Sequence, residues 1–123
     1  MQLGELETFI TKLMWTMGSG SVKDVHEQVQ TTRNVTKNTV QSTLERLNRK
    51  GVLRRSKCSH AYIYEPKLTR EQLTAQLVGK LLSEFDSDPS MTLAAFVEQQ
   101  APVSAEKMAQ LRALITELKA QES

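Results

Sequence analysis

Apolar residues recur at helical spacing in the first part of the chain. Their spacing of three and four predicts a helix over residues 3–17 and a shorter one over residues 22–30, with Ser21 as its N-cap. A third helix is expected between Thr36 and Gly51, where threonine is a suitable N-cap and glycine suits the left-handed residue that follows a helix. This order of helix, short helix, connection and helix is the outline of a helix-turn-helix.

The third predicted helix has an apolar stripe and an unusual polar face. Val40, Leu44 and Leu47 form the stripe. The opposite side and its flanks hold mainly amides, hydroxyls and guanidiniums: Asn38, Thr39, Gln41, Ser42, Glu45, Arg46 and Arg49. Amides and guanidiniums bind purine edges through two atoms, and short hydroxyls let a helix lie close to a groove. We therefore expect this face to contact DNA bases, the plain alternative being a solvated surface helix that lacks acids.

After the third helix the pattern changes from helical to alternating. Residues 52–57 are predicted to form a strand, residues 58–60 a turn, and residues 61–66 a returning strand that Pro66 ends. Such a hairpin can lie along DNA phosphates beside a helix in the major groove. Five basic residues are expected to neutralise phosphates: Arg49, Lys50, Arg54, Arg55 and Lys57. The alternative is that the hairpin's basic residues only protect an edge strand from aggregation.

Basic residues are concentrated in one part of the chain. The 123 residues have a net charge of +2, yet residues 33–57 hold eight Lys or Arg and one acid, a net charge of +7. Residues 1–66 carry +4 and residues 67–123 carry −2. This asymmetry is typical of a polyanion-binding half joined to a half with another task.

Three further amphipathic helices are predicted after Pro66. The first begins at a capping box of Thr69 and Gln72. Two breaks, at residues 86–89 and 102–103, each contain a proline and separate the three helices from one another. With no further sheet to cover them, we expect their apolar faces to form a homodimer, the alternative being that they fold back onto the first domain. The residues expected at the dimer contact are Leu73, Leu77, Leu81, Phe85, Phe96, Leu111, Leu114, Ile115 and Leu118.

Other classes of function find little support in the residues. An enzyme would need titrating groups that converge in a pocket, whereas His26 and His60 lie far apart in the sequence. A metal sensor built on Cys58 and the histidines would rest on a weak Cys-x-His signal. We therefore predict no enzyme, no metal and no cofactor. A cytoplasmic location is expected, because no apolar run reaches the roughly 20 residues of a membrane span and no signal-peptide pattern opens the chain.

Three stretches resemble the penicillinase-repressor family. They are LGELETFITKLMW at residues 3–15, NTVQSTLERLNRKGVLRR at residues 38–55 and AYIYEP at residues 61–66. The resemblance extends over nearly the whole chain and is strongest over residues 3–66. Trp15 near the end of the first helix is part of it, and its expected role is that of a core anchor.

The resemblance implies a mainly α protein with a small β-hairpin wing. Residues 1–67 would form a winged helix-turn-helix domain and residues 68–123 a helical dimerisation domain. Such proteins repress transcription as homodimers on a palindromic, double-stranded DNA operator. The family's reading-helix and wing contacts correspond to Lys37, Asn38, Thr39, Ser42 and Arg46, and to Arg54, Arg55 and Lys57.

The resemblance also implies a sensor protease as a partner. In the antibiotic-resistance branch, cleavage before a Phe in the C-terminal domain disables dimerisation. The corresponding bond is Ala95–Phe96, where the family's usual Asn is replaced by Ala.

A protein-protein adaptor is the alternative function, because winged helices also serve as docking surfaces. A docking helix would normally expose an apolar or aromatic anchor. Aromatic residues make up only 5% of this chain, and the polar, acid-poor face favours DNA instead.

Overall fold

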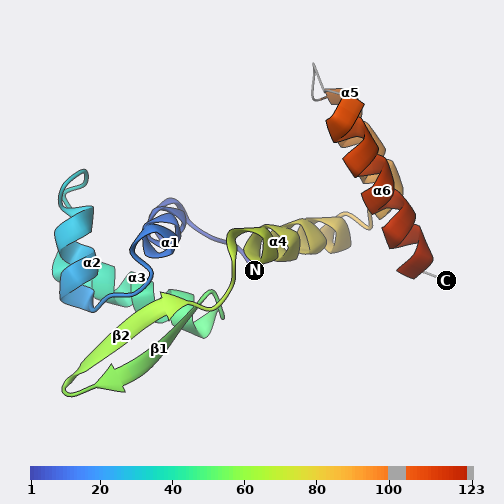
Figure 1. Cartoon of the computed structure of the whole chain (residues 1–123). Coiled ribbons are helices and arrows are strands. Elements are labelled where there is room, and N and C mark those ends of the chain that lie inside the picture. The colour runs from blue at the N-terminus through green and yellow to red at the C-terminus, as the bar shows by residue number, and fades with distance from the viewer. Residues whose placement is uncertain (100–104, 122–123) are drawn as a thin grey trace. The chain divides into compact units, whose positions relative to one another are not determined.

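The structure, a computed structural model, describes residues 1–99 and 105–121 (Figure 1). The chain divides into two compact units, Met1–Leu77 and Val78–Ser123, which are treated separately below. Their helices and strands are α1 (Glu5–Met17), α2 (Val22–Val29), α3 (Lys37–Arg49), β1 (Leu53–Cys58), β2 (Ala61–Pro66), α4 (Arg70–Glu84), α5 (Pro89–Gln99) and α6 (Ala105–Gln121).

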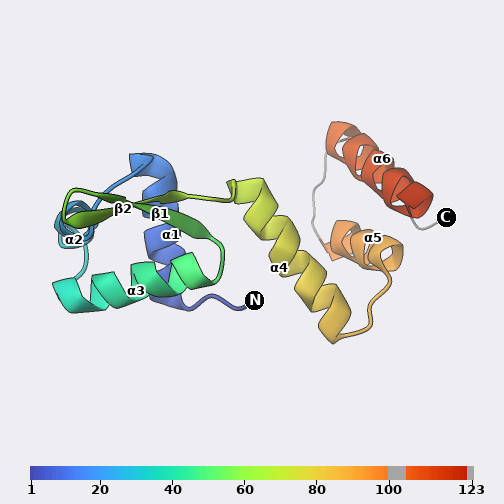
Figure 2. The ribbon, with the colours of Figure 1, turned by 90° about the horizontal axis from the view of Figure 1, so that it is seen from below.

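The first unit is a winged helix, as predicted. In Figure 2, α3 lies beside α1, and the hairpin follows its C-terminal end. The apolar stripe of α3 is fully buried, as are apolar residues from both other helices and the hairpin. The core consists of Ile10, Met14, Val25, Val29, Val40, Leu44, Leu47, Val52, Leu53, Tyr64 and Leu73. Burial of these side chains provides the main driving force for folding of this unit.

Local signals determine where the elements of this unit begin and end. The first helix starts at Glu5 rather than at residue 3, because Gly4 is its N-cap and donates its N–H to the Glu7 carboxylate at 3.2 Å. Ser21 caps α2 as predicted, accepting the Asp24 N–H at 3.1 Å. Gly51 follows α3 with a φ of +80°, as its position in the sequence predicted.

The hairpin pairs β1 with β2 in an antiparallel register. Its first strand runs to Cys58, one residue further than predicted, so the turn is formed by Ser59 and His60. Two backbone bonds join Gly20 to Tyr64, with N···O distances of 3.0 and 2.9 Å. The hairpin is therefore tied to the connection between α1 and α2 as well as to α3.

The first half of α4 belongs to the first unit. Leu73, which the sequence placed at a dimer contact, is instead 4% exposed in the core of this unit, and Leu77 packs against that core. These two residues therefore follow the alternative in which the helices fold back onto the first domain. The compact unit accordingly ends at Leu77, ten residues beyond the predicted domain boundary at residue 67.

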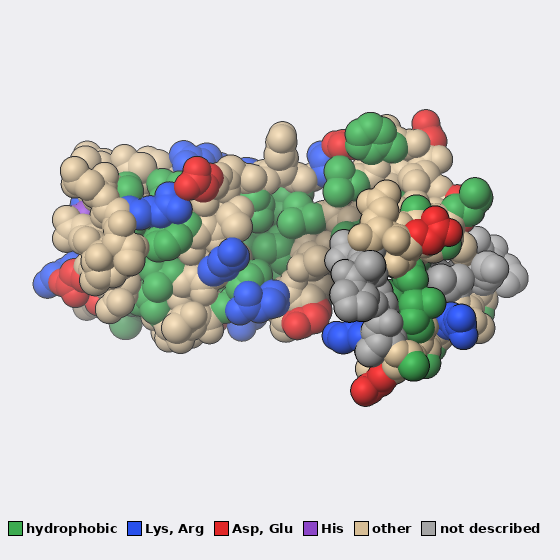
Figure 3. Space-filling view, turned by 90° about the horizontal axis from the view of Figure 1, so that it is seen from above, with side chains coloured by type: hydrophobic (Ala, Val, Ile, Leu, Met, Phe, Trp, Pro, Cys, Tyr) green, Lys and Arg blue, Asp and Glu red, His purple; other side chains and the backbone are tan. Residues whose placement is uncertain are grey.

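In the second unit, α5 and α6 pack against each other (Figures 1 and 2). Several large apolar side chains of this unit remain on its surface, with Phe85 77% exposed and Met91 75% exposed. Figure 3 shows apolar side chains beside charged ones over this part of the chain. The predicted break at residues 102–103 and the side chains of Ile115 and Leu118 lie outside the described part of the structure.

Candidate nucleic-acid interface

Helix α3 presents its polar face to solvent. The Thr36 hydroxyl accepts the Thr39 N–H at 3.2 Å and so fixes the start of the helix. Because the apolar stripe faces the core, seven of the predicted contact residues are exposed: Lys37, Asn38, Thr39, Gln41, Ser42, Arg46 and Arg49. Glu45 is the only acid of the helix and is half-buried. The exposed face therefore carries hydrogen-bonding groups and positive charge.

Short contacts within α3 orient three of these side chains. Ser42 Oγ donates to the Asn38 carbonyl at 3.0 Å, and Gln41 Nε2 donates to Glu45 Oε1 at 3.3 Å. Arg46 Nη2 donates to the hydroxyl of buried Thr43 at 3.2 Å. These bonds leave other donors of Gln41 and Arg46 for a ligand and restrict their rotamers before binding.

The turn before α3 is held by a histidine. His26 Nε2 lies 2.9 Å from the Val35 carbonyl oxygen, which can only accept, so the ring nitrogen is the donor. His26 therefore connects α2 to the residue that precedes the N-cap of α3. The sequence analysis considered His26 as a catalytic group or a metal ligand, and the nine-residue separation of the two partners gave no local signal for this contact.

The two faces of the hairpin carry different basic residues. Alternate residues of a strand share a face, and so do residues directly opposite in the register. Arg55 and Lys57 therefore lie on the same face as Tyr64 and Tyr62, their partners in β2. Buried Leu53 lies at the base of this face, so the face extends outward from the core.

Two tyrosines hold the Arg55 guanidinium. Its Nη1 donates to the Tyr64 hydroxyl at 3.2 Å, and its Cζ lies 4.1 Å from the centroid of the Tyr62 ring. The hydrogen bond to Tyr64 raises the pKa of Arg55 against the effect of burial, and the charge of Glu45 adds to the rise. Strand β1, which carries Arg55, contacts α3. The aromatic partners of Arg55 were not predicted from the sequence.

Arg54 lies on the other face of the hairpin. It pairs there with Glu65, its partner in the register, at a distance of 2.7 Å between Nε and Oε1. Its charge is thus compensated within the hairpin, unlike that of Lys57. The structure therefore separates Arg54 from the other two basic residues of the predicted wing contact.

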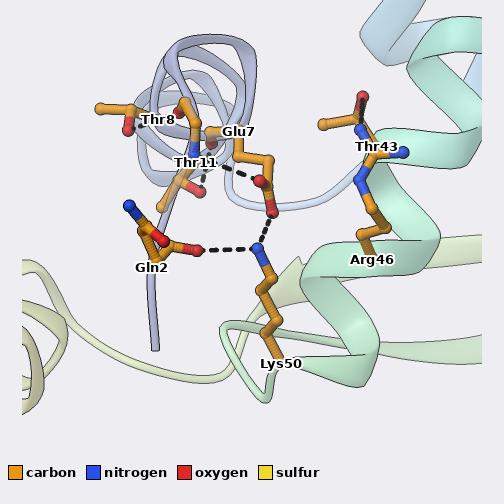
Figure 4. Close-up of polar contacts among 8 residues, drawn as sticks. Gln2, Glu7, Thr8, Thr11, Thr43, Arg46 and Lys50 are labelled. Carbon is orange, nitrogen blue, oxygen red and sulfur yellow. Dashed lines mark hydrogen bonds and ion pairs between the residues drawn. The ribbon is translucent and has the colours of Figure 1, made fainter.

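Lys50 differs from the exposed residues of α3, because its ammonium group contacts Glu7 and Gln2 (Figure 4). Its Nζ lies 2.6 Å from Glu7 Oε2 and 2.8 Å from the Gln2 carbonyl oxygen. Burial of Glu7 opposes ionisation, but hydrogen bonds from Lys50 and Gly4 and the charge of Arg46 outweigh it and lower the pKa of Glu7. Lys50 therefore joins α3 to α1, which is a structural contact within the unit.

The model of the penicillinase repressor family matches residues 3–117. The chain belongs to the penicillinase repressor family. The resemblance drawn from the sequence is thus confirmed, and membership in a family of repressors supports the prediction that the chain is not an enzyme.

Relatives and solved structures agree with this assignment. The chain is 29% identical over 120 residues to the transcriptional regulator BlaI of Mycobacterium tuberculosis, covering 97% of this chain and 86% of the relative. It resembles the solution structure of the DNA-binding domain of the repressor BlaI, with a TM-score of 0.53, 25% identity, and coverage of 58% of this chain and 87% of that one. The Bacillus licheniformis BlaI monomer in complex with the blaP half-operator gives a TM-score of 0.51 at 25% identity, covering 58% and 88% of the two chains.

The bond expected from the family's proteolytic branch lies inside a helix. Ala95 and Phe96 are both in α5, where Phe96 is 51% exposed. Proteases generally cleave extended chain, so cutting this bond would require α5 to unfold locally.

Over residues 1–99 and 105–121, no three His, Cys, Asp or Glu side chains gather as a metal site. Among the helices of these same ranges, none has the length and apolar character needed to cross a bilayer.

Proposed function

We propose that this penicillinase-repressor family member is a sequence-specific transcriptional repressor that binds double-stranded DNA through α3 and the hairpin. The observation that supports this most directly is the exposed, acid-poor face of α3 next to the hairpin face of Arg55 and Lys57. A helix of this kind enters the major groove while the hairpin contacts flanking phosphates.

The geometry suggests a division of roles among the exposed residues. Asn38, Thr39, Ser42 and Arg46 would contact base edges, where a good two-pronged contact discriminates by about 1–3 kcal/mol. Lys37, Arg49, Arg55 and Lys57 would contact phosphates. Lys50 and Arg54 have no such role in this proposal, because each is bound to a carboxylate of its own unit.

We further propose that the repressor is a homodimer on a palindromic operator. Support comes from the exposed apolar residues Leu81, Phe85, Phe96 and Leu114, which a second copy of the chain would cover. In the complex of the related BlaI, a monomer is bound to a half-operator. By analogy, each protomer of the proposed homodimer would bind one half-site of its own operator.

Substitutions of Arg46 and Arg55 test the proposed roles. Arg46→Ala is expected to reduce binding to the operator more than binding to random DNA, because a base contact is lost. Arg55→Ala is expected to weaken both equally, because a phosphate contact carries no sequence information. Gel-shift titrations on both DNAs measure this, and equal losses for both variants would contradict the proposed roles.

A further inference from the structure

The segment between the hairpin and α4 is bound tightly to the first unit. Only residues 67–69 separate β2 from α4. The N–H groups of Lys67 and Leu68 both point to the Val52 carbonyl, at 2.9 and 3.4 Å. Val52 itself is fully buried. This connection is therefore part of the folded unit.

Trp15 fixes the same connection from the side of α1. Its indole N–H donates to the Leu68 carbonyl at 2.9 Å, across 53 residues of sequence. The Arg70 guanidinium lies over the indole ring, with its Cζ 4.8 Å from the ring centroid. Such a stack contributes through both charge and contact area. Trp15 thus holds the residue before the α4 N-cap and the first residue of the helix.

The first turns of α4 are fixed as well. Thr69 and Gln72 form a reciprocal capping box, with bonds of 2.9 and 3.1 Å. Leu73 then enters the core of the unit. The capping box, the stack of Arg70 on Trp15 and the buried Leu73 together fix the first turns of α4. They therefore determine the direction of these turns relative to α3 in the same unit.

We propose that Trp15 is a positioning residue that sets which spacing of operator half-sites the homodimer accepts. This inference rests on the proposed function, because it requires two copies on one palindrome. Two linked binding modules reach their full affinity only when their geometry matches that of the two sites. The exposed residue Leu81 of the proposed dimer contact belongs to the same helix α4. We therefore infer that the attachment of the first turns of α4 limits which positions the two reading helices can take on one duplex.

The test uses the full chain and duplexes whose half-sites are separated by different spacers. Wild type is expected to lose about tenfold or more in affinity when the spacer grows by about two base pairs, which rotates one half-site by about 70°. Trp15→Phe keeps a ring but removes the indole donor, and Arg70→Gln removes the stack. Both variants are expected to lose less than about threefold in affinity when the spacer grows by the same two base pairs. Their affinity for a single half-site should stay within about twofold of wild type.

Arg33→Gln is the matched control. Arg33 stacks on Phe9 at 4.4 Å in the same unit, but it does not hold α4. The Arg33→Gln variant is expected to keep the spacing profile of wild type, that is, the same dependence of affinity on spacer length. If Trp15→Phe does not fold, as judged by circular dichroism, Arg70→Gln provides the test with the indole in place.

The outcomes separate the inference from the proposed function. If wild type is selective for spacing and both variants keep its profile at unchanged half-site affinity, the inference is wrong while the homodimer stands. If wild type shows no preference among spacers but binds two half-sites more tightly than one, the inference is overturned while the homodimer stands. If two half-sites bind no more tightly than one, the homodimer on a palindrome is wrong, and the inference, which rests on it, is overturned with it.

Discussion

Arg54 and Lys57 are separated by two residues but lie on opposite faces of the hairpin. Arg54 is paired with Glu65, whereas Lys57 shares its face with Arg55 and Tyr62. We expect Lys57→Ala to reduce the slope of log affinity against log salt by about one, as for the loss of one phosphate contact. Arg54→Ala serves as the matched control because it removes the same charge from the other face.

Fluorescence anisotropy on one duplex over a range of salt concentrations measures both slopes. The slope for Arg54→Ala should stay close to that of wild type. A larger change for Arg54→Ala than for Lys57→Ala would show that DNA lies against the opposite face of the hairpin.

Glu7 and Lys50 give a prediction about acid stability. Because the folded state lowers the pKa of Glu7 below its ordinary value of 4.5, the contribution of this carboxylate is complete above about pH 4.5. It is lost as the pH falls through the lowered pKa, since the unfolded state then binds the proton more readily. Glu7→Gln should lower the free energy of unfolding by about 1–3 kcal/mol at neutral pH.

Urea unfolding of wild type and Glu7→Gln at several pH values measures this difference. It should be constant near neutral pH and shrink on acidification below about 4.5. Asp24, whose pKa is lowered by the backbone and hydroxyl of Ser21, is present in both proteins and cancels in the comparison. A difference that grows on acidification would contradict the role given to the Glu7–Lys50 pair.

At the scale of elements, the end of α3 depends on a glycine. Gly51 has a φ of +80°, a conformation that costs a residue with a side chain about 1–2 kcal/mol. Gly51→Ala should therefore lower the free energy of unfolding by about this amount, although an added methyl group would meet no atom within 4 Å. Thermal denaturation measures the change.

Gly79 is the matched control for this substitution. It also has open space around it, but it lies inside α4, where alanine is favoured over glycine by about 0.5–1 kcal/mol. Gly79→Ala should leave stability unchanged or raise it. Equal destabilisation by both substitutions would mean that the backbone conformation of Gly51 is not the cause.

The elements themselves could be predicted because their signals are local. Caps at Ser21, Thr36 and Thr69, and the apolar stripe of α3, occur within a few residues of the features they determine. The exposed face of α3 follows directly from that stripe. Burial in the structure confirms the prediction for Val40, Leu44 and Leu47.

Contacts between distant residues could not be predicted in this way. In the sequence, Lys50 is a basic residue directly after Arg49, and nothing local distinguishes the two. Only the structure shows that Lys50 is bound to Glu7, which is 43 residues away in the sequence. Leu73 continues the apolar stripe of its helix, and the sequence does not show which surface that stripe covers. The separation of Arg54 from Lys57 required the register of the hairpin.

At the scale of the whole molecule, the two units have different surface chemistry. The first buries a continuous core and exposes polar and basic groups on α3 and the hairpin. The second leaves large apolar side chains such as Phe85 and Met91 on its surface. This difference supports the two proposed tasks, DNA binding by the first unit and self-association by the second. The boundary between the units lies inside α4, at Leu77.

The most direct measurement is a gel-shift titration of the full chain. It compares the chain's own upstream promoter region with a scrambled sequence of equal length at two salt concentrations. We predict selective binding to the promoter, as a dimer, with affinity that falls steeply as salt increases. Weak binding that is equal on both DNAs would contradict sequence-specific repression, and the winged helix would then be better explained as a protein-docking module.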